Sequence, residues 1–254
     1  MNFKKIIDLV IEASKFIADE NLINTIKNKC EIDFVTEADI KINDFLKSEF
    51  KKIDNTIGFF TEEECGQLTA PCWIIDPIDG TTNLIYGYKM CSISVGLFFN
   101  GEIQFSVVYN PFSKELFSSE KGKGAFLWNK RLHVSSRNIN KSLIEIGIVS
   151  KTKKYADISF DIAKNIYKDC LDIRRVCSAA LDLCYIADSR LDGYFEIQIE
   201  PWDIAAGSLI LTEAGGKITC FDGDEIQFSQ STSVIASNNI IHGYLQKSIN
   251  TFML

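Results

Sequence analysis

Residues 73–83 read Trp73-Ile74-Ile75-Asp76-Pro77-Ile78-Asp79-Gly80-Thr81-Thr82-Asn83. The apolar start is typical of a short, fully buried strand, and it delivers two carboxylates, three residues apart, into a Gly-Thr-Thr turn. The proline stiffens the backbone, the glycine allows close approach to a ligand, and the amides and hydroxyls that follow can face an anion. Hard divalent ions such as Mg²⁺ prefer carboxylate and carbonyl oxygens. The stretch therefore favours a metal and anion site over an Asp-rich turn that only caps a helix.

The spacing of the two acids argues against one competing chemistry. Phosphatases with an aspartyl nucleophile carry D-x-D-G-T at a strand end, with one residue between the acids. Here two residues separate Asp76 from Asp79. The pattern of nucleophile and adjacent acid therefore does not carry over to this chain.

Outward from this strand, the hydrophobic periodicity predicts a layered α+β protein. The N-terminal part predicts two helices, and the centre predicts a hairpin across Asn100-Gly101 with further antiparallel strands. From about Lys141 strands and helices alternate, which places a domain boundary near residue 140 that no linker marks. The expected helices cover residues 3–26, 36–53, 153–168, 179–189 and 204–214, and the expected strands cover 72–75, 91–99, 102–109, 116–117, 124–134, 143–149, 171–176, 194–197 and 234–236.

Composition narrows the class of protein. The 254 residues are 46% hydrophobic and 24% charged, which is ordinary globular composition. The net charge of −7, from 27 basic and 34 acidic residues, makes nucleic acid or an anionic membrane an unlikely main partner. No apolar run approaches the roughly 20 residues needed to cross a bilayer, and the N-terminus lacks a signal-peptide core. We therefore expect a cytoplasmic protein.

The cysteines and histidines also bear on the cellular compartment and on the kind of site. The eight cysteines form no C-x-x-C pair, and several lie in apolar runs, so we expect reduced, buried thiols. His133 and His242 are the only histidines and lie far apart in sequence. A zinc site is therefore poorly supplied, and a catalytic triad built on histidine is not expected.

Four weaker signals gain weight beside residues 73–83. Thr61-Glu62-Glu63-Glu64 alone is typical of a solvated acidic turn. Thr36-Glu37-Ala38-Asp39 has the form of a capping box at a helix start. Pro201-Trp202-Asp203 places Asp203 where a helix N-cap belongs. Tyr194-Phe195-Glu196 ends a predicted strand with an acid that, taken alone, favours exposure.

Together these segments resemble the inositol monophosphatase family, the lithium-sensitive, Mg²⁺-dependent sugar and inositol phosphatases. The two specific signatures are Asp-Pro-Ile-Asp-Gly-Thr-Thr-Asn at 76–83 and Trp-Asp-Ile-Ala-Ala-Gly at 202–207, the latter followed by Glu-Ala-Gly-Gly at 213–216. The bacterial members also carry runs like those at 178–183 and 192–196. The resemblance implies a layered αβαβα sandwich, of the inositol monophosphatase and fructose-1,6-bisphosphatase type, in which residues 1–254 form a single catalytic unit.

The resemblance also assigns roles to residues. It implies two to three Mg²⁺ per site, with the first held by Glu62, Asp76 and the Ile78 carbonyl, and the second by Asp76, Asp79 and Asp203. Thr81, hydrogen-bonded toward Asp39, would help to deprotonate the attacking water. The remaining residues implied by the resemblance contact the substrate: Asp79, Gly80, Thr81 and Asp203 near the phosphate, and Ser178, Ala179 and Glu196 on the alcohol side.

The implied reaction is hydrolysis of a small polyol or sugar phosphate by a metal-activated water. Myo-inositol monophosphate is the leading substrate, with fructose 1,6-bisphosphate and 3′-phosphoadenosine 5′-phosphate as alternatives, and a homodimer is usual in the family. A non-enzymatic alternative is a regulatory protein that contacts transcription or RNA-processing machinery. This chain departs from the family at Cys177, where glycine is common, and at Glu200, where a basic residue is common. Its Glu-Glu-Glu-Cys-Gly loop leaves Glu62 and Glu63 both open as the metal ligand, with Glu62 preferred.

Overall fold

The computed structural model describes the chain except for residues 1, 31–32, 65, 149–152 and 254. Its helices are α1 (Phe3–Ala13), α2 (Glu20–Asn24), α3 (Glu37–Ile53), α4 (Thr81–Ile85), α5 (Ala156–Tyr167), α6 (Ala179–Ala187), α7 (Pro201–Glu213) and α8 (His242–Asn250), with short 3₁₀ helices η1 (Ser14–Ala18) and η2 (Ile139–Lys141). Its strands are β1 (Ile26–Cys30), β2 (Asp33–Thr36), β3 (Gly58–Thr61), β4 (Cys72–Asp79), β5 (Ser92–Phe99), β6 (Glu102–Asn110), β7 (Glu115–Glu120), β8 (Gly124–Leu127), β9 (Lys130–Arg131), β10 (Leu143–Ile146), β11 (Asp172–Arg174), β12 (Gly193–Ile199), β13 (Lys217–Thr219) and β14 (Thr232–Ser237).

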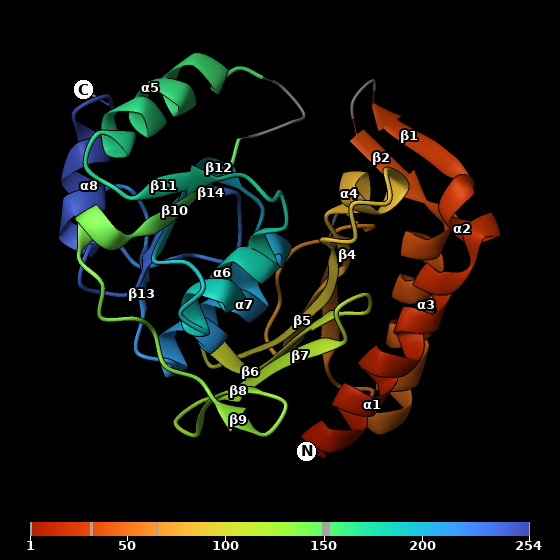
Figure 1. The fold of residues 1–254 in the computed structure, drawn as a ribbon. Coiled ribbons are helices and arrows are strands. Elements are labelled where there is room, and N and C mark those ends of the chain that lie inside the picture. Colours follow the sequence, from red (N-terminus) through yellow and green to blue (C-terminus); the bar gives the residue numbers. More distant parts are fainter. Residues whose placement is uncertain (1, 31–32, 65, 149–152, 254) are drawn as a thin grey trace.

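Two large sheets and three helical layers form the αβαβα sandwich (Figure 1). A seven-stranded sheet has the order β3-β4-β5-β6-β7-β8-β9, with only the β3–β4 pair parallel. A five-stranded sheet has the order β11-β10-β12-β14-β13. Helices α1 and α3 cover the outer face of the first sheet, α5 and α8 cover that of the second, and α6 and α7 lie between the sheets. The predicted fold class is confirmed.

Helix α7 connects the two halves because nearly its whole circumference is apolar and buried. It contacts β4, β5, β6, β7 and β8 of the first sheet and β13 of the second. A helix that is apolar all round needs neighbours on every side, which the inner layer of a sandwich provides. The first sheet is built from residues before 140 and the second from residues after it. That the whole chain acts as one catalytic unit stays a prediction.

The helix expected over residues 3–26 is wrong in its length. Helix α1 ends at Ala13, where the Ser14 hydroxyl donates a hydrogen bond to the carbonyl of Ile11 at 2.7 Å. A 3₁₀ segment follows, and Asp19 then caps the separate helix α2 by accepting a hydrogen bond from the Asn21 N–H at 3.0 Å. Buried Ile17 within the 3₁₀ segment keeps the apolar spacing nearly helical. The hydrophobic pattern therefore does not indicate that the helix ends at Ala13.

Several elements were not expected from the sequence: β1, β2, β3, β13, α4 and α8. The hairpin across Asn100-Gly101 is confirmed, and both residues have positive φ, as its turn requires. The strand expected over 143–149 ends at Ile146, and Val149 lies outside the described residues. The expected helix starting near Thr36 is confirmed as α3, with the predicted Thr36–Asp39 capping box.

The thiols only partly match the expectation. The six cysteines whose side chains are described form no disulfide, and their reduced state stays a prediction. Cys72, Cys91 and Cys184 are buried, whereas Cys177 is exposed and Cys170 and Cys220 are intermediate.

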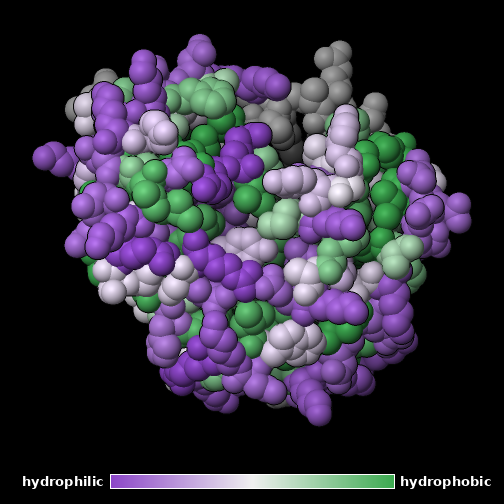
Figure 2. All heavy atoms as spheres, in the orientation of Figure 1, coloured by the Kyte–Doolittle hydropathy of each residue, from purple (hydrophilic) through white to green (hydrophobic). Residues whose placement is uncertain are grey.

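The face in Figure 2 is largely hydrophilic, with smaller hydrophobic groups between the polar residues. Among the described residues, no helix combines the length and the apolar character needed to span a membrane.

Candidate metal centre

A cavity of about 580 Å³ opens between the two halves of the molecule. It is lined at one end by residues of β4 and of the turns after β3 and β4, and at the other by residues of β12, α6 and α7. Two residues considered from the sequence do not line it: Glu63, and Asp39, which contacts Thr81. The lining residues predicted from the sequence are Glu62, Asp76, Ile78, Asp79, Gly80, Thr81, Ser178, Ala179, Glu196 and Asp203.

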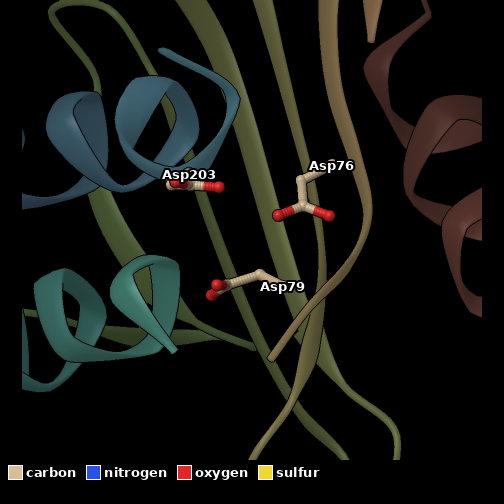
Figure 3. Close-up of side chains that lie close together, drawn as sticks. All are labelled: Asp76, Asp79 and Asp203. Atoms are coloured by element: carbon tan, nitrogen blue, oxygen red, sulfur yellow. The ribbon is translucent and has the colours of Figure 1, made fainter. Parts of the chain in front are cut away.

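Three carboxylates converge within this cavity. Asp76 and Asp79 come from the end of β4, and Asp203 comes from the first turn of α7 (Figure 3). One oxygen of each lies within 4.8 Å of the others. Asp76 and Asp79 are buried and Asp203 is partly buried. Residues about 125 positions apart in sequence thus form one acidic cluster.

An irregularity in β4 allows its two acids to face the same space. Residues three apart on a regular strand point to opposite faces. Here the register against β5 shifts between Asp76, which pairs with Ser94, and Asp79, which pairs with Ser92. One extra residue is therefore accommodated at Pro77-Ile78, where proline lacks the N–H that a regular ladder needs.

Asp203 differs in detail from its expected position. The structure places Glu200 at the N-cap of α7 and Asp203 at the third helical position, so the expectation of Asp203 as N-cap is wrong. The Glu200 N–H donates to Asp203 Oδ2 at 3.3 Å, which completes a capping box. One Asp203 oxygen thus supports the helix start, while the carboxylate faces the other acids.

The electrostatics of the cluster are unfavourable without a cation. Burial, followed by the charges of Glu62, Asp79, Asp203 and Asp39, raises the pKa of Asp76 well above its ordinary value. Burial raises the pKa of Asp79 to about 7, although hydrogen bonds from Ser178 and Ala180 lower it. Burial and the charges of Asp79 and Glu62 also raise the pKa of Asp203 well above its ordinary value. A bound divalent cation would remove this repulsion.

The donor set fits a hard divalent cation. The converging side chains all offer carboxylate oxygens, the ligands that Mg²⁺ prefers. The three acids also lie close enough for shared coordination. The identity and number of metal ions implied by the resemblance remain proposals.

The structure distinguishes the two candidate glutamates of the acidic turn. Glu62 lines the cavity, and its charge contributes to the raised pKa of Asp76, Asp79 and Asp203. Glu63 is not among the lining residues, and its charge, like that of Glu62, raises the pKa of Asp39. We therefore retain Glu62 as the proposed ligand.

Thr81 and Asp39 form the contact that the resemblance implied. Thr81 Oγ1 lies 3.2 Å from Asp39 Oδ1 and 2.9 Å from the Ile78 carbonyl oxygen. The other Asp39 oxygen accepts from the Thr36 N–H at 2.7 Å and from the Thr36 hydroxyl at 2.6 Å. Burial raises the pKa of Asp39 to about 7 despite these bonds. Asp39 therefore has two functions, capping α3 and accepting from Thr81.

Gly80 occupies a position that only glycine fits easily. Its φ is +93°, and a Cβ there would lie 2.8 Å from the Met90 carbonyl oxygen. Gly80 and Thr81 both line the cavity. This arrangement agrees with the sequence argument for close approach of a ligand.

The first residues of α6 are tied directly to the acidic cluster. Ser178 Oγ donates to Asp79 Oδ2 at 2.6 Å, and the Ala180 N–H donates to the same oxygen at 2.9 Å. Cys177, just before them, has a φ of +64°. Ser178 and Ala179 line the cavity, and their contact with the alcohol part of a substrate stays a prediction.

Glu196 lies in the middle of β12, so the expectation of an exposed acid at a strand end is wrong. Its carboxylate is partly buried, lines the cavity, and accepts from the Tyr194 hydroxyl at 2.5 Å. Burial raises the pKa of Glu196 to about 7. An acid in this position can accept a hydrogen bond from a hydroxyl of a bound ligand.

Several further cavity residues received no role from the sequence, among them Asn83, Asp182 and Tyr194. Asn83 was quoted within the first signature, and its Nδ2 donates to the carbonyls of Met90 and Val176, both at 2.7 Å. It thereby holds the turn after β4 against the segment before α6. The i, i+2 spacing of Tyr194 and Glu196 places them on one strand face and could have indicated their pairing. Asp182 lies inside an apolar helix, which gave no signal beyond its charge.

Comparisons with known proteins by family model, by sequence and by structure agree with one another. The model of the "Inositol monophosphatase family" matches residues 3–253. "Nus factor SuhB" of Pasteurella multocida is 37% identical over 222 residues, covering 85% of this chain and 82% of that protein. "Inositol-1-monophosphatase" of Mesorhizobium japonicum is 36% identical over 221 residues, covering 85% and 83%. The solved structure of Thermotoga maritima IMPase has a TM-score of 0.89 at 30% identity, covering 99% of this chain and 97% of that one.

Proposed function

From the premise that this chain belongs to the inositol monophosphatase family, we propose that it is a Mg²⁺-dependent phosphomonoesterase. Its substrate would be a small phosphorylated polyol or sugar, with myo-inositol monophosphate as the leading candidate. The observation that carries the proposal is the convergence of Asp76, Asp79 and Asp203 within 4.8 Å, in a cavity that Glu62 also lines. Lithium sensitivity, a homodimer and a cytoplasmic location stay predictions from the family.

The charge balance supports the proposed cofactor. The four carboxylates carry −4, and a phosphate monoester adds nearly −2, so the bare site repels its substrate. Glu62, Asp76, the Ile78 carbonyl, Asp79 and Asp203 would hold two to three Mg²⁺ ions. Bound divalent cations would neutralise the phosphate, lower the pKa of water and stabilise the leaving alkoxide.

The side chains around the cluster would supply orientation and proton acceptance. When the Thr81 hydroxyl donates its hydrogen to Asp39, its oxygen can accept a hydrogen bond from a water at the cavity wall. The amides of Gly80 and Thr81 would hold phosphate oxygens. Ser178 fixes Asp79 and, with Ala179 and Glu196, forms the wall that the alcohol part would contact. Direct attack of water then requires no covalent enzyme intermediate.

Phosphate release from a substrate panel tests this proposal. We expect inositol, sugar or nucleotide phosphates to be hydrolysed with Mg²⁺ and not in excess EDTA, because the site is repulsive without cations. The panel contains myo-inositol 1-phosphate, fructose 1,6-bisphosphate and 3′-phosphoadenosine 5′-phosphate. Full turnover in EDTA, or no release from any ester, would contradict the proposal.

The Nus factor name of one relative supports a second candidate function. In this second proposal, the chain is a regulatory protein that contacts transcription machinery. The net charge of −7 favours protein contacts over direct nucleic-acid contacts in that case. Binding to purified transcription factors, with and without active-site substitutions, separates this function from hydrolysis. The complete acid set favours the enzyme as the first proposal.

Glu196→Gln is expected to reduce kcat/KM for inositol or sugar phosphates about tenfold to a hundredfold, since a charged hydrogen bond contributes roughly 1.5–3 kcal/mol. Glutamine can still accept from the Tyr194 hydroxyl, so the local structure should persist. p-Nitrophenyl phosphate has no hydroxyl for Glu196 and serves as the control substrate. Equal losses on both substrates would show that Glu196 supports the metal site or the fold instead.

A further inference from the structure

The turn that carries Glu62 is fixed by its two ends. The N–H of Glu64 donates to the carbonyl of Thr61 at 3.2 Å, which closes a four-residue turn with Glu62 and Glu63 at its centre. The Glu62 N–H donates to the Ile75 carbonyl of β4, also at 3.2 Å. The direction of the Glu62 side chain therefore depends on where Thr61 and Glu64 are held.

Thr61 belongs to β3, but Glu64 is held from outside the sheet, by helix α3. Lys47 forms an ion pair with Glu64 Oε1, and Asn43 Nδ2 donates to the same oxygen at 3.4 Å. The Lys47 side chain is only 18% exposed against 54% for Glu64, and its ammonium lies 5.8 Å from the centre of the Phe59 ring. The lysine is thus held against the protein and is not a freely moving surface cation.

One face of α3 serves both parts of the site. Asp39, Asn43 and Lys47 are spaced four residues apart, so they share a face of the helix. Asp39 contacts Thr81 after β4, while Asn43 and Lys47 contact Glu64 after β3. A rigid helix therefore links the positions of Thr81 and of the Glu62 turn.

We propose that Lys47 and Asn43 are positioning residues, which hold the turn at residues 61–64 so that Glu62 faces the cation site. The inference rests on the proposed function, because it assigns Glu62 to that site. Neither residue lines the cavity. Residues that orient metal ligands from outside commonly change metal affinity about 10- to 100-fold. Because Glu64 is 54% exposed, the ion pair contributes at most about 1 kcal/mol to folding, so the fold should tolerate its loss.

The charge of Lys47 and its proposed positioning role predict opposite effects of Lys47→Met on Mg²⁺ affinity. Removing a positive charge near an acidic site would, through electrostatics alone, tighten Mg²⁺ binding. Releasing the turn would weaken it. We expect Lys47→Met to bind Mg²⁺ about tenfold more weakly by isothermal titration calorimetry. Lys47→Arg retains the ion pair and should bind nearly as tightly as the wild type.

A double variant sharpens the distinction. Lys47→Met with Glu64→Gln removes one charge of each sign and leaves the net charge unchanged. If charge alone matters, the double variant binds Mg²⁺ as tightly as the wild type, whereas the positioning role predicts that it binds as weakly as Lys47→Met. Lys52→Met is the matched control, because Lys52 lies on the same helix, pairs with Glu49 and does not contact the turn. It removes the same charge and should leave Mg²⁺ affinity unchanged within about twofold.

The outcomes separate this inference from the proposed function. Weaker binding by Lys47→Met and by the double variant, with normal binding by Lys47→Arg and Lys52→Met, supports it. Unchanged or tighter Mg²⁺ binding by Lys47→Met, or wild-type affinity in the double variant, overturns the positioning role and leaves the proposed function untouched. A wild-type protein that binds no Mg²⁺ overturns both. Thermal unfolding in EDTA verifies that every variant is folded before titration.

Discussion

Asp76→Asn is expected to lower kcat by about a thousandfold or more, while the protein stays folded. Asp76 lies at the centre of the acidic cluster and is the residue whose pKa the other four carboxylates all raise. In the proposed site it contacts both principal cations. Asparagine removes the negative charge and one anionic ligand at almost the same volume. The measurement is phosphate release at saturating substrate over a range of Mg²⁺ concentrations.

Stability in EDTA should change in the opposite direction. Asp76 Oδ1 accepts from the Ile78 N–H at 2.9 Å, and the asparagine carbonyl can replace that acceptor. Asp39 and Asp79 have pKa values raised to about 7, so the folded, metal-free protein binds more protons than the unfolded chain between about pH 4 and 7. Its stability therefore falls as the pH rises through that window. Asp76→Asn relieves the repulsion, so its melting temperature in EDTA at pH 8 should equal or exceed that of the wild type.

Asp203→Asn provides the comparison. It should lose activity in the same way, because its carboxylate belongs to the same cluster. Its capping contact to the Glu200 N–H contributes only about 1 kcal/mol, and asparagine can retain it. A lower melting temperature with normal kcat would assign Asp203 to helix capping alone. Normal kcat in Asp76→Asn would remove the basis for the proposed metal centre.

The residue types of this site could be predicted from the sequence, but the geometry that unites them could not. Asp76 and Asp79 lie three apart, and only the bulge at Pro77-Ile78 turns both toward one cavity. The β strand pattern gives no indication of that bulge beyond the proline. Asp203 joins them because α7 is buried between the sheets, which its uniformly apolar sequence indicated.

The failures of prediction have a common physical cause. The break after α1 depends on the Ser14 and Asp19 side chains bonding to nearby backbone, which leaves the apolar spacing almost unchanged. Glu196, taken alone, favoured exposure, since a charged residue is usually exposed. Its burial is compensated by the Tyr194 hydroxyl, whose position depends on the folded strand. Local pattern therefore located the elements, whereas polar contacts between side chains and backbone decided the exceptions.

The buried Asp192 offers the largest stability effect away from the cavity. It precedes β12 and is fully buried. Its oxygens accept from the Arg137 Nε–H at 2.9 and 3.0 Å and from the Leu143 N–H at 2.9 Å, and they also accept from the Ser135 hydroxyl. Its backbone bonds to Leu143 and Asn238. Through its carboxylate and its backbone, Asp192 thus joins the segment that leaves the first sheet to β10, to the start of β12 and to the residue after β14.

Asp192→Asn is expected to lower the free energy of unfolding by about 3 kcal/mol. The asparagine NH₂ cannot accept a hydrogen bond, so either the Leu143 N–H or the Ser135 hydroxyl loses its acceptor, and Arg137 loses its charged partner. Arg137 keeps its charge and remains 36% exposed, which places the expected loss at the lower end for a broken buried pair.

Urea unfolding at pH 7 in EDTA measures this effect without contribution from bound metal. Asp172→Asn is the matched control, since Asp172 also pairs with an arginine, Arg174, but both side chains are nearly half exposed. That exposed pair should contribute less than about 1 kcal/mol. If Asp192→Asn cost no more than Asp172→Asn, the carboxylate network would not hold the second sheet to the preceding segment. The attachment of this segment to the second sheet would then depend on apolar packing, because Leu132 and Val134 already pack in the core between the sheets.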